Sequence, residues 1–170
     1  MLTLGPLNAS HRAALHRLLC STDAFRAEEV AVALELFDET FGPTKPTGDY
    51  EFVAAFNGAD ALVGYCCYGA TPTTDATYDL YWIAVDLAHQ GGGVGSLLLE
   101  EVEHRVRGRR GRMVVIETSA GNGYDSARRF YGARGYDVAA RLRDYYGPAD
   151  DRVVFTRQFD RSLSPAHSGA

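Results

Sequence analysis

Apolar residues recur along this chain at two spacings, one typical of helices and one typical of strands. Helical spacing occurs in four places, and a short strand-like segment at residues 1–4 precedes the first of them. Asn8 or Ser10 would cap the first predicted helix. The other three helices are expected at residues 23–41, 93–108 and 125–134. In the last of these, an aspartate is expected at the N-cap and Gly135 at the C-terminal stop.

Runs of β-branched and aromatic residues predict six further strands. Two of them flank Asn57-Gly58-Ala59-Asp60, a turn signal of the hairpin type. The strands are expected at residues 50–56, 61–70, 77–85, 113–116, 136–143 and 152–159. The order is therefore one strand, two helices, three strands, a helix, a strand, a helix and two strands, which indicates an α/β or α+β fold with a mixed sheet.

The predicted elements follow one another without an internal repeat or an interdomain linker. We therefore expect residues 1–161 to form a single domain and residues 162–170 a flexible tail. The Gly- and Pro-containing loop at 42–48 is either a plain connector or part of a binding rim. The strand at 77–85, the next helix and the strand from Met113 form one β-α-β unit, whose strands are normally parallel.

Charge and composition narrow the class of partner. The 170 residues carry 17 basic and 22 acidic side chains, a net charge of -5, so no global positive field attracts nucleic acid or an anionic membrane. The arginines from Arg105 to Arg112 are interpreted as a solvated helix end. The three cysteines lack zinc-ligand spacing, and no apolar run approaches the roughly 20 residues that span a bilayer. A cytoplasmic protein without a bound metal is expected.

A glycine cluster lies between the strand at 77–85 and the following helix. Its backbone N–H groups and the helix dipole suit a phosphate or pyrophosphate, but a tight turn with positive φ needs the same glycines. A P-loop is excluded because no lysine follows the last glycine. The dinucleotide pattern fails because its third glycine would fall on Ser96 or Leu98. The cluster consists of Gln90, Gly91, Gly92, Gly93, Val94, Gly95 and Ser96.

The spacing Gln-x-x-Gly-x-Gly at Gln90, Gly93 and Gly95 resembles the pyrophosphate-binding motif of the GNAT superfamily of acyl-CoA-dependent N-acetyltransferases. The strand at 80–86 looks like the family's sheet-opening strand. Residues 127–136 are similar to its last-helix signature, with a tyrosine aimed at the coenzyme sulfur. The resemblance covers the element order of the whole chain. It implies a mostly antiparallel sheet of about seven strands flanked by about four helices.

The resemblance implies an enzyme that transfers an acetyl group from acetyl-CoA to a primary amine by direct attack, without a metal. Residues 90–96 would bind the pyrophosphate. Ile83 and Val85 would bind the pantetheine arm through their backbone, where the strands at 78–85 and 113–118 splay apart. The acceptor would be a small-molecule amine or a peptide lysine, and a homodimer is a fair expectation from the family. The alternative is an acyl-CoA-binding sensor without efficient transfer activity.

Proton transfer has three candidate side chains. Tyr131 is the expected general acid, since its hydroxyl can protonate a leaving thiolate, although a core tyrosine would fit the same position. Asp79 and Glu117 are candidates for the base or for an anchor of the amine; a water chain or two solvated charges are the alternatives. Tyr124 stands where the family often has an asparagine that contacts the coenzyme. It would bind the ligand or pack on the core.

Overall fold

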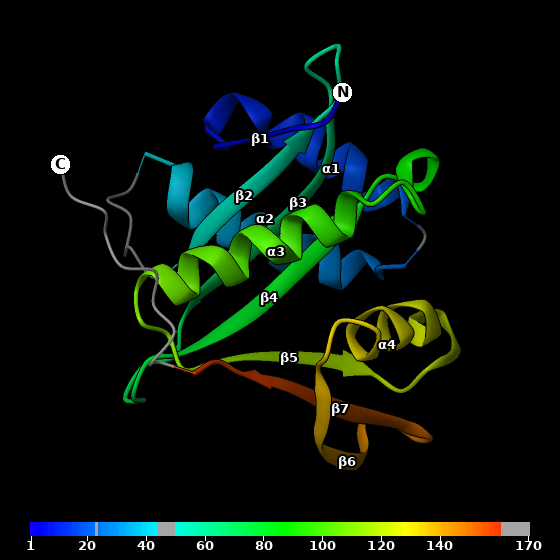
Figure 1. Ribbon diagram of the computed structural model, residues 1–170. Coiled ribbons are helices and arrows are strands. Elements are labelled where there is room, and N and C mark those ends of the chain that lie inside the picture. Colours follow the sequence, from blue (N-terminus) through cyan, green and yellow to red (C-terminus); the bar gives the residue numbers. More distant parts are fainter. Residues whose placement is uncertain (23, 44–49, 161–170) are drawn as a thin grey trace, which may run out of the picture. The chain divides into compact units, whose positions relative to one another are not determined.

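A computed structural model describes residues 1–22, 24–43 and 50–160 of the chain (Figure 1). Most of the loop expected at 42–48 and the tail expected at 162–170 lie outside these residues. The strands are β1 (Thr3–Gly5), β2 (Glu51–Phe56), β3 (Leu62–Ala70), β4 (Thr77–Val85), β5 (Met113–Ser119), β6 (Asp137–Gly147) and β7 (Asp150–Gln158). The helices are α1 (Arg12–Ser21), α2 (Ala27–Phe41), α3 (Val94–Gly108) and α4 (Asp125–Gly132).

The strands form one open mixed sheet in the order β1-β2-β3-β4-β5-β7-β6. β4 and β5 pair in parallel, as the β-α-β unit between them predicts, whereas the β1–β2, β2–β3, β5–β7 and β6–β7 pairs are antiparallel. The mostly antiparallel α/β fold and the element order predicted from the sequence are therefore confirmed. Among the described residues, no helix combines the length and the apolar character needed to cross a bilayer.

The chain divides into two compact units, which are described one at a time. The first unit contains Met1–Gly69 and Tyr81–Val102, and the second contains Ala70–Leu80 and the chain from Glu103 onward. β4 and α3 each contribute residues to both units. The expectation of a single domain over residues 1–161 stays a prediction.

The first unit has helices on both faces of its strands. α1 and α2 bury their apolar stripes against one face of β2 and β3, and the first part of α3 crosses the other face (Figure 1). The periodic leucines of α1 are at most 3% exposed, as their spacing predicts. The core of the α1 and α2 side consists of Leu7, Leu15, Leu18, Leu19, Val30, Ala33, Leu34, Phe37, Phe52, Ala54, Tyr65, Cys67 and Ala84.

Gly64 in β3 sets the distance between α3 and the strands of the first unit. A Cβ at this position would lie 2.7 Å from Val94 Cγ1, 3.1 Å from Leu98 Cδ1 and 3.3 Å from the Ala84 carbonyl oxygen. The first two atoms belong to the N-terminal turns of α3, directly after the glycine cluster. A residue without a side chain is thus required for the close approach that positions the start of this helix.

We expect Gly64→Ala to lower the free energy of unfolding by about 1–3 kcal/mol, because the added methyl group overpacks a filled interface. Urea denaturation of the variant and the unaltered protein measures the loss. Gly147→Ala is a suitable control, since nothing lies within 4 Å of a Cβ built there. A Gly64→Ala variant as stable as this control would contradict the packing described for α3.

A buried carboxylate links three elements of the second unit. Glu103 of α3 is only 5% exposed, and its oxygens accept hydrogen bonds from Arg157 Nη1 at 2.8 and 2.9 Å. The Tyr136 hydroxyl donates to Glu103 Oε1 at 3.1 Å. Burial, and then the negative charge of Glu103, raise the pKa of Tyr136 above its ordinary value. No local sequence pattern indicates this network, because Tyr136 and Arg157 are 33 and 54 positions from Glu103.

The arginines at and after the end of α3 are mostly exposed, as expected for a solvated helix end, and two of them also make contacts within the second unit. Arg107 pairs with Glu103 at 3.4 Å, and its guanidinium lies 4.5 Å from the centre of the Phe159 ring. Arg112 Nε donates to the Asp75 carbonyl oxygen at 3.2 Å. Both contacts lie within the second unit, and the Arg107 side chain remains 48% exposed.

Two element boundaries differ from the sequence prediction in ways that affect candidate residues. β5 continues to Ser119, so Glu117 lies within a strand instead of at its end. The N-cap of α4 is Tyr124, without a side-chain cap bond, whereas Asp125 is the first helical residue and pairs with Arg128. The cap was misplaced because an aspartate before a helix is the stronger sequence signal.

Candidate coenzyme and catalytic residues

Residues 90–93 of the glycine cluster form a turn directly before α3, in which two glycines have a left-handed backbone. Gly91 has φ of 75° and Gly93 has φ of 84°, values that other residues rarely adopt. Nothing lies within 4 Å of a Cβ built at either glycine, so this side of the turn is open. An open turn at the start of a 15-residue helix can present backbone N–H groups to a diphosphate. The residues present therefore fit the group that the sequence motif implies.

Asp86 fixes the path of the chain from β4 into the turn. Its Oδ1 accepts the Ala88 N–H at 3.0 Å and lies 3.0 Å from His89 Nδ1. The Ser21 hydroxyl of α1 donates to Oδ2 at 3.1 Å. The hydrogen bond with His89, supported by those from Ser21 and Ala88, holds the pKa of Asp86 below its usual value. The sequence interpretation missed this anchor.

Gln90, the first residue of the motif, turns its side chain back to the end of β4. Its Nε2 donates to the Val85 carbonyl oxygen at 3.2 Å. The side chain therefore braces the turn against the strand that precedes it, and the Val85 carbonyl already accepts a hydrogen bond. Val94 begins α3 and is 2% exposed, while Gly95 and Ser96 belong to the first turn of the helix.

Gly93→Ala is expected to raise the Kd for acetyl-CoA about tenfold, because an alanine at this φ is strained by about 1–2 kcal/mol and the turn would relax away from its present shape. Calorimetric titration gives the affinity. Gly108→Ala, at the last residue of α3, is the matched control: a Cβ there meets nothing within 4 Å, and alanine favours the helix. Equal affinities for Gly93→Ala and the control would contradict a ligand-binding role for the turn.

Tyr131 of α4 is held rigidly in the second unit. It is 5% exposed, and its ring centre lies 5.7 Å from that of Phe155, 6.1 Å from that of Tyr136 and 5.4 Å from that of Phe130. Aromatic contacts on several sides fix the direction of the phenol. This packing is compatible with both roles predicted for Tyr131, a core residue and a general acid with a positioned hydroxyl.

The strand register places Asp79 and Glu117 on one face of the sheet. Asp79 pairs with Val115, and Glu117 is two residues further along β5, so the two carboxylates share a face. The intervening Ile116 pairs with Phe155, which packs against Tyr131. Tyr131 therefore lies on the α4 side of these strands, opposite to the face that carries the two carboxylates.

The two carboxylates have different surroundings. Asp79 Oδ2 accepts a hydrogen bond from the Thr71 hydroxyl at 2.6 Å, and its strand position is paired with β5. Glu117 lies beyond the last β4–β5 pair, Leu80 with Ile116, and its side chain is 41% exposed. It contacts the guanidinium of Arg152. Glu117 is thus the carboxylate with more access to a ligand.

Tyr124 stands at the position where the family often has an asparagine that contacts the coenzyme. It is the N-cap residue of α4 and is partly exposed, and its N–H donates to the Gly121 carbonyl oxygen at 3.0 Å. Its contact with a coenzyme stays a prediction.

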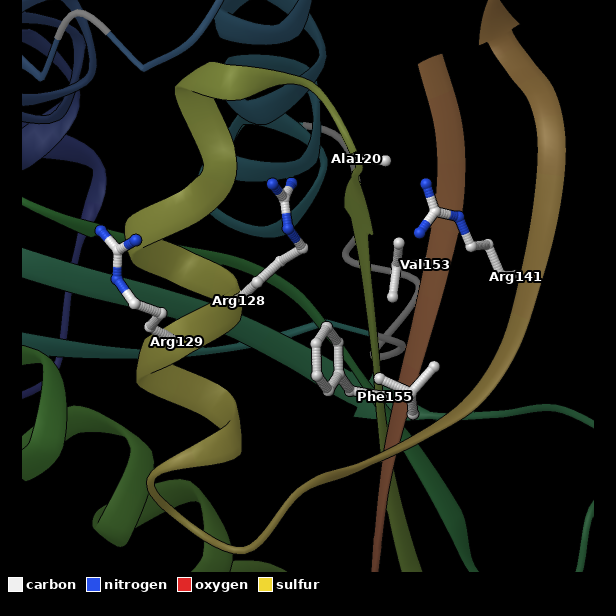
Figure 2. Close-up of a pocket in the computed structure, with 7 residues that line it drawn as sticks. Ala120, Arg128, Arg129, Arg141, Val153 and Phe155 are labelled. Atoms are coloured by element: carbon white, nitrogen blue, oxygen red, sulfur yellow. The ribbon is translucent and has the colours of Figure 1, made fainter. Parts of the chain in front are cut away.

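A pocket of about 450 Å³ lies under α4 in the second unit (Figure 2). Its buried residues Val153 and Phe155 pair with Thr118 and Ile116, so it opens on the face opposite to Glu117. Figure 2 shows Arg128 and Arg141 on either side of Val153. Sequence reasoning did not predict this pocket. It is lined by Ala120, Arg128, Arg129, Val138, Arg141, Val153 and Phe155.

The candidate residues fall into two groups, one in each unit. Ile83, Val85 and the glycine cluster belong to the first unit. The carboxylates, Tyr124 and Tyr131 belong to the second. Within the first unit, the glycine cluster forms the turn before α3 and the first turn of that helix. Within the second unit, the two carboxylates lie on one face of the strands. The splay of β4 and β5 stays a prediction.

The chain is similar in sequence to known proteins. The sequence model of the acetyltransferase (GNAT) domain matches residues 48–138. The N-alpha-acetyltransferase RimI of Mycobacterium tuberculosis is 31% identical over 136 residues, which cover 75% of this chain and 81% of that protein.

Among solved structures, a protein of Desulfovibrio desulfuricans described as a GNAT-family acetyltransferase is 38% identical. It has a TM-score of 0.86 and covers 93% of this chain and 99% of its own. The ribosomal-protein-S18-alanine N-acetyltransferase of Escherichia coli shares the fold, with a TM-score of 0.75 at 20% identity over 100% of this chain and 99% of its own. The extent of the domain match and the identity to these relatives show that the chain is an acyltransferase and belongs to the GNAT acetyltransferase family.

Proposed function

We propose that this protein transfers the acetyl group of acetyl-CoA to a primary amine by direct attack. The observation that carries the proposal is the open left-handed turn at Gly91 and Gly93, at the start of α3 and inside the matched domain. Two proteins that share the fold support the choice of coenzyme. A Salmonella typhimurium structure contains acetyl-CoA, and an aminoglycoside 6'-N-acetyltransferase structure contains coenzyme A.

The first unit supplies the proposed coenzyme-binding groups. Gln90–Ser96 would bind the diphosphate through backbone N–H groups, and the backbone of Ile83 and Val85 would bind the pantetheine arm. Bound acetyl-CoA supplies the acetyl group as an activated thioester. Gln90 contributes indirectly by bracing the turn against β4.

The second unit supplies the groups proposed to move protons. Glu117 takes a proton from the incoming ammonium, directly or through a water molecule, so that the amine is free to attack. Tyr131 donates its phenolic proton to the departing sulfur. The amine and the sulfur are bonded to the same carbon during transfer, whereas Glu117 and Tyr131 lie on opposite faces of β5 and β7. Of the two routes for Glu117, the one through a water molecule fits this arrangement. Asp79, already bonded to Thr71, is the less accessible candidate for the base.

The acceptor is proposed to be an amine of a peptide or of a small molecule. The two named relatives act on protein amines according to their names, one as an N-alpha-acetyltransferase and one on an alanine of ribosomal protein S18. An N-terminal α-amine is therefore the first acceptor to test, beside a peptide lysine and a small amine.

Thiol release in the presence of acetyl-CoA tests the proposal. The acceptors are a peptide with a free N-terminal alanine, an N-terminally blocked peptide with one lysine, and a diamine, and mass spectrometry identifies the acetylated product. Transfer to at least one acceptor above the rate without protein is expected. Acetyl-CoA binding without transfer to any amine would instead support an acyl-CoA-binding sensor.

A further inference from the structure

Arg152 of β7 contacts both the proposed base, Glu117, and Tyr145 of β6. Its Nη2 contacts Glu117 Oε1, and its Nη1 donates to the Tyr145 hydroxyl at 2.9 Å. The guanidinium also lies over the Tyr145 ring, 4.8 Å from the ring centre. Arg152 and Val154 are two residues apart on β7 and so lie on the same face, and Val154 pairs with Glu117. Arg152 and Glu117 therefore share that face. One guanidinium is thereby held between a carboxylate and a phenol.

The position of Tyr145 depends on an interruption of the hairpin. The β6–β7 register shifts between Leu142 and Gly147, so the chain bulges over residues 143–146. Asp144 adopts a left-handed φ of 51°, and its N–H donates to Asp151 Oδ1 at 2.9 Å. This backbone hydrogen bond, followed by the one from Arg141, holds the pKa of Asp151 below its usual value. The bulge is thus a fixed feature that presents Tyr145 to Arg152.

The Arg152 side chain is half-buried beside the more exposed carboxylate of Glu117. The Arg152 side chain is 23% exposed, whereas that of Arg12, paired with Asp38, is 51% exposed. Arg152 Nε is buried and has no hydrogen-bond partner among the described residues. Leaving a buried N–H without a partner is unfavourable, so the two contacts made by the Nη atoms must outweigh that loss. These contacts therefore restrict the motion of the Arg152 guanidinium more than the contacts of an exposed ion pair would.

We propose that Arg152 is a positioning residue for Glu117 and that Tyr145 in turn holds Arg152. The inference rests on the proposed role of Glu117 in transfer. Arg152 fixes Oε1 and so limits the rotamers of the carboxylate, which leaves Oε2 to accept the proton of the acceptor. Correct placement of a proton acceptor is a large part of its effect on rate.

A double-mutant cycle between Arg152 and Glu117 tests this role. Arg152→Gln is expected to lower kcat about tenfold with an unchanged KM for acetyl-CoA, and Glu117→Gln to lower kcat about 100-fold. The Arg152→Gln/Glu117→Gln double variant should equal Glu117→Gln alone within about twofold, since Arg152 acts only through Glu117. Arg12→Gln, which breaks a surface ion pair in the first unit, is the control and should leave kcat unchanged.

Conservative variants separate positioning from folding. Arg152→Lys keeps the charge beside Glu117, and Tyr145→Phe keeps the ring but removes the hydroxyl that accepts from Nη1. Each should lose less kcat than Arg152→Gln at an unchanged melting temperature, and these two variants decide the matter if Arg152→Gln does not fold. If the two substitutions lowered kcat independently, so that their fold losses multiplied in the double variant, the inference would be overturned. An unchanged kcat in Arg152→Gln would also overturn it. Neither result would contradict the proposed function. An unaltered protein that transfers no acetyl group would overturn the proposed function and with it the inference.

Discussion

Tyr131→Phe is expected to lower kcat for acetyl transfer about 100-fold while the Kd for acetyl-CoA changes by less than about twofold. The phenylalanine keeps the ring that packs against Phe155 and Tyr136, so the fold of α4 is preserved. Only the proton that the hydroxyl donates is lost. Thiol release at saturating substrates gives kcat, and calorimetry gives the affinity.

Tyr136→Phe is the matched control, because Tyr136 is a second buried tyrosine of the same unit whose hydroxyl bonds Glu103. This variant should lose about 1 kcal/mol of stability and retain its kcat. Unchanged kcat in Tyr131→Phe, with the protein folded, would show that Tyr131 is a core residue only. Equal losses of kcat in both variants would indicate a general effect of disturbing the second unit.

Glu103→Gln is expected to lower the free energy of unfolding by about 3 kcal/mol and the Tm by roughly 10 °C. The neutral amide keeps only one acceptor oxygen for Arg157, and the buried position loses the negative charge that pairs with this half-buried guanidinium. Urea denaturation and thermal unfolding measure the change.

Glu100→Gln provides the comparison for Glu103→Gln within the same helix. Glu100 is exposed, so its substitution should change stability by less than about 0.5 kcal/mol. If both variants were equally stable, the Glu103 network would not be a principal contact of the second unit.

Elements with a strong local pattern were predictable from the sequence. The limits of β4 agree with the structure, and α3 begins at Val94, one residue after its predicted start, and ends at Gly108 as expected. Apolar periodicity and the positive φ of Gly91 and Gly93 are local properties, and local properties can be read from neighbouring residues. The same locality explains why the glycine motif was found.

Features that depend on distant residues were not predictable. The Glu103–Arg157 contact joins residues 54 positions apart, and the Glu117–Arg152 pair depends on the order β5-β7-β6, which no local pattern specifies. The chain contains many arginines, so sequence alone could not separate Arg152 and Arg157, which are half-buried in ion pairs, from solvated ones. Which face of β5 carries Glu117 followed only from its register with β7.

Calorimetric titration of the folded protein with acetyl-CoA, beside ATP and NAD, tests the central claim most directly. We predict binding of acetyl-CoA at micromolar concentrations and no binding of the two other nucleotides, because the turn at Gly91 and Gly93 lacks both the P-loop lysine and the dinucleotide spacing. Absence of acetyl-CoA binding to well-folded protein would contradict the proposed coenzyme and the transfer reaction built on it.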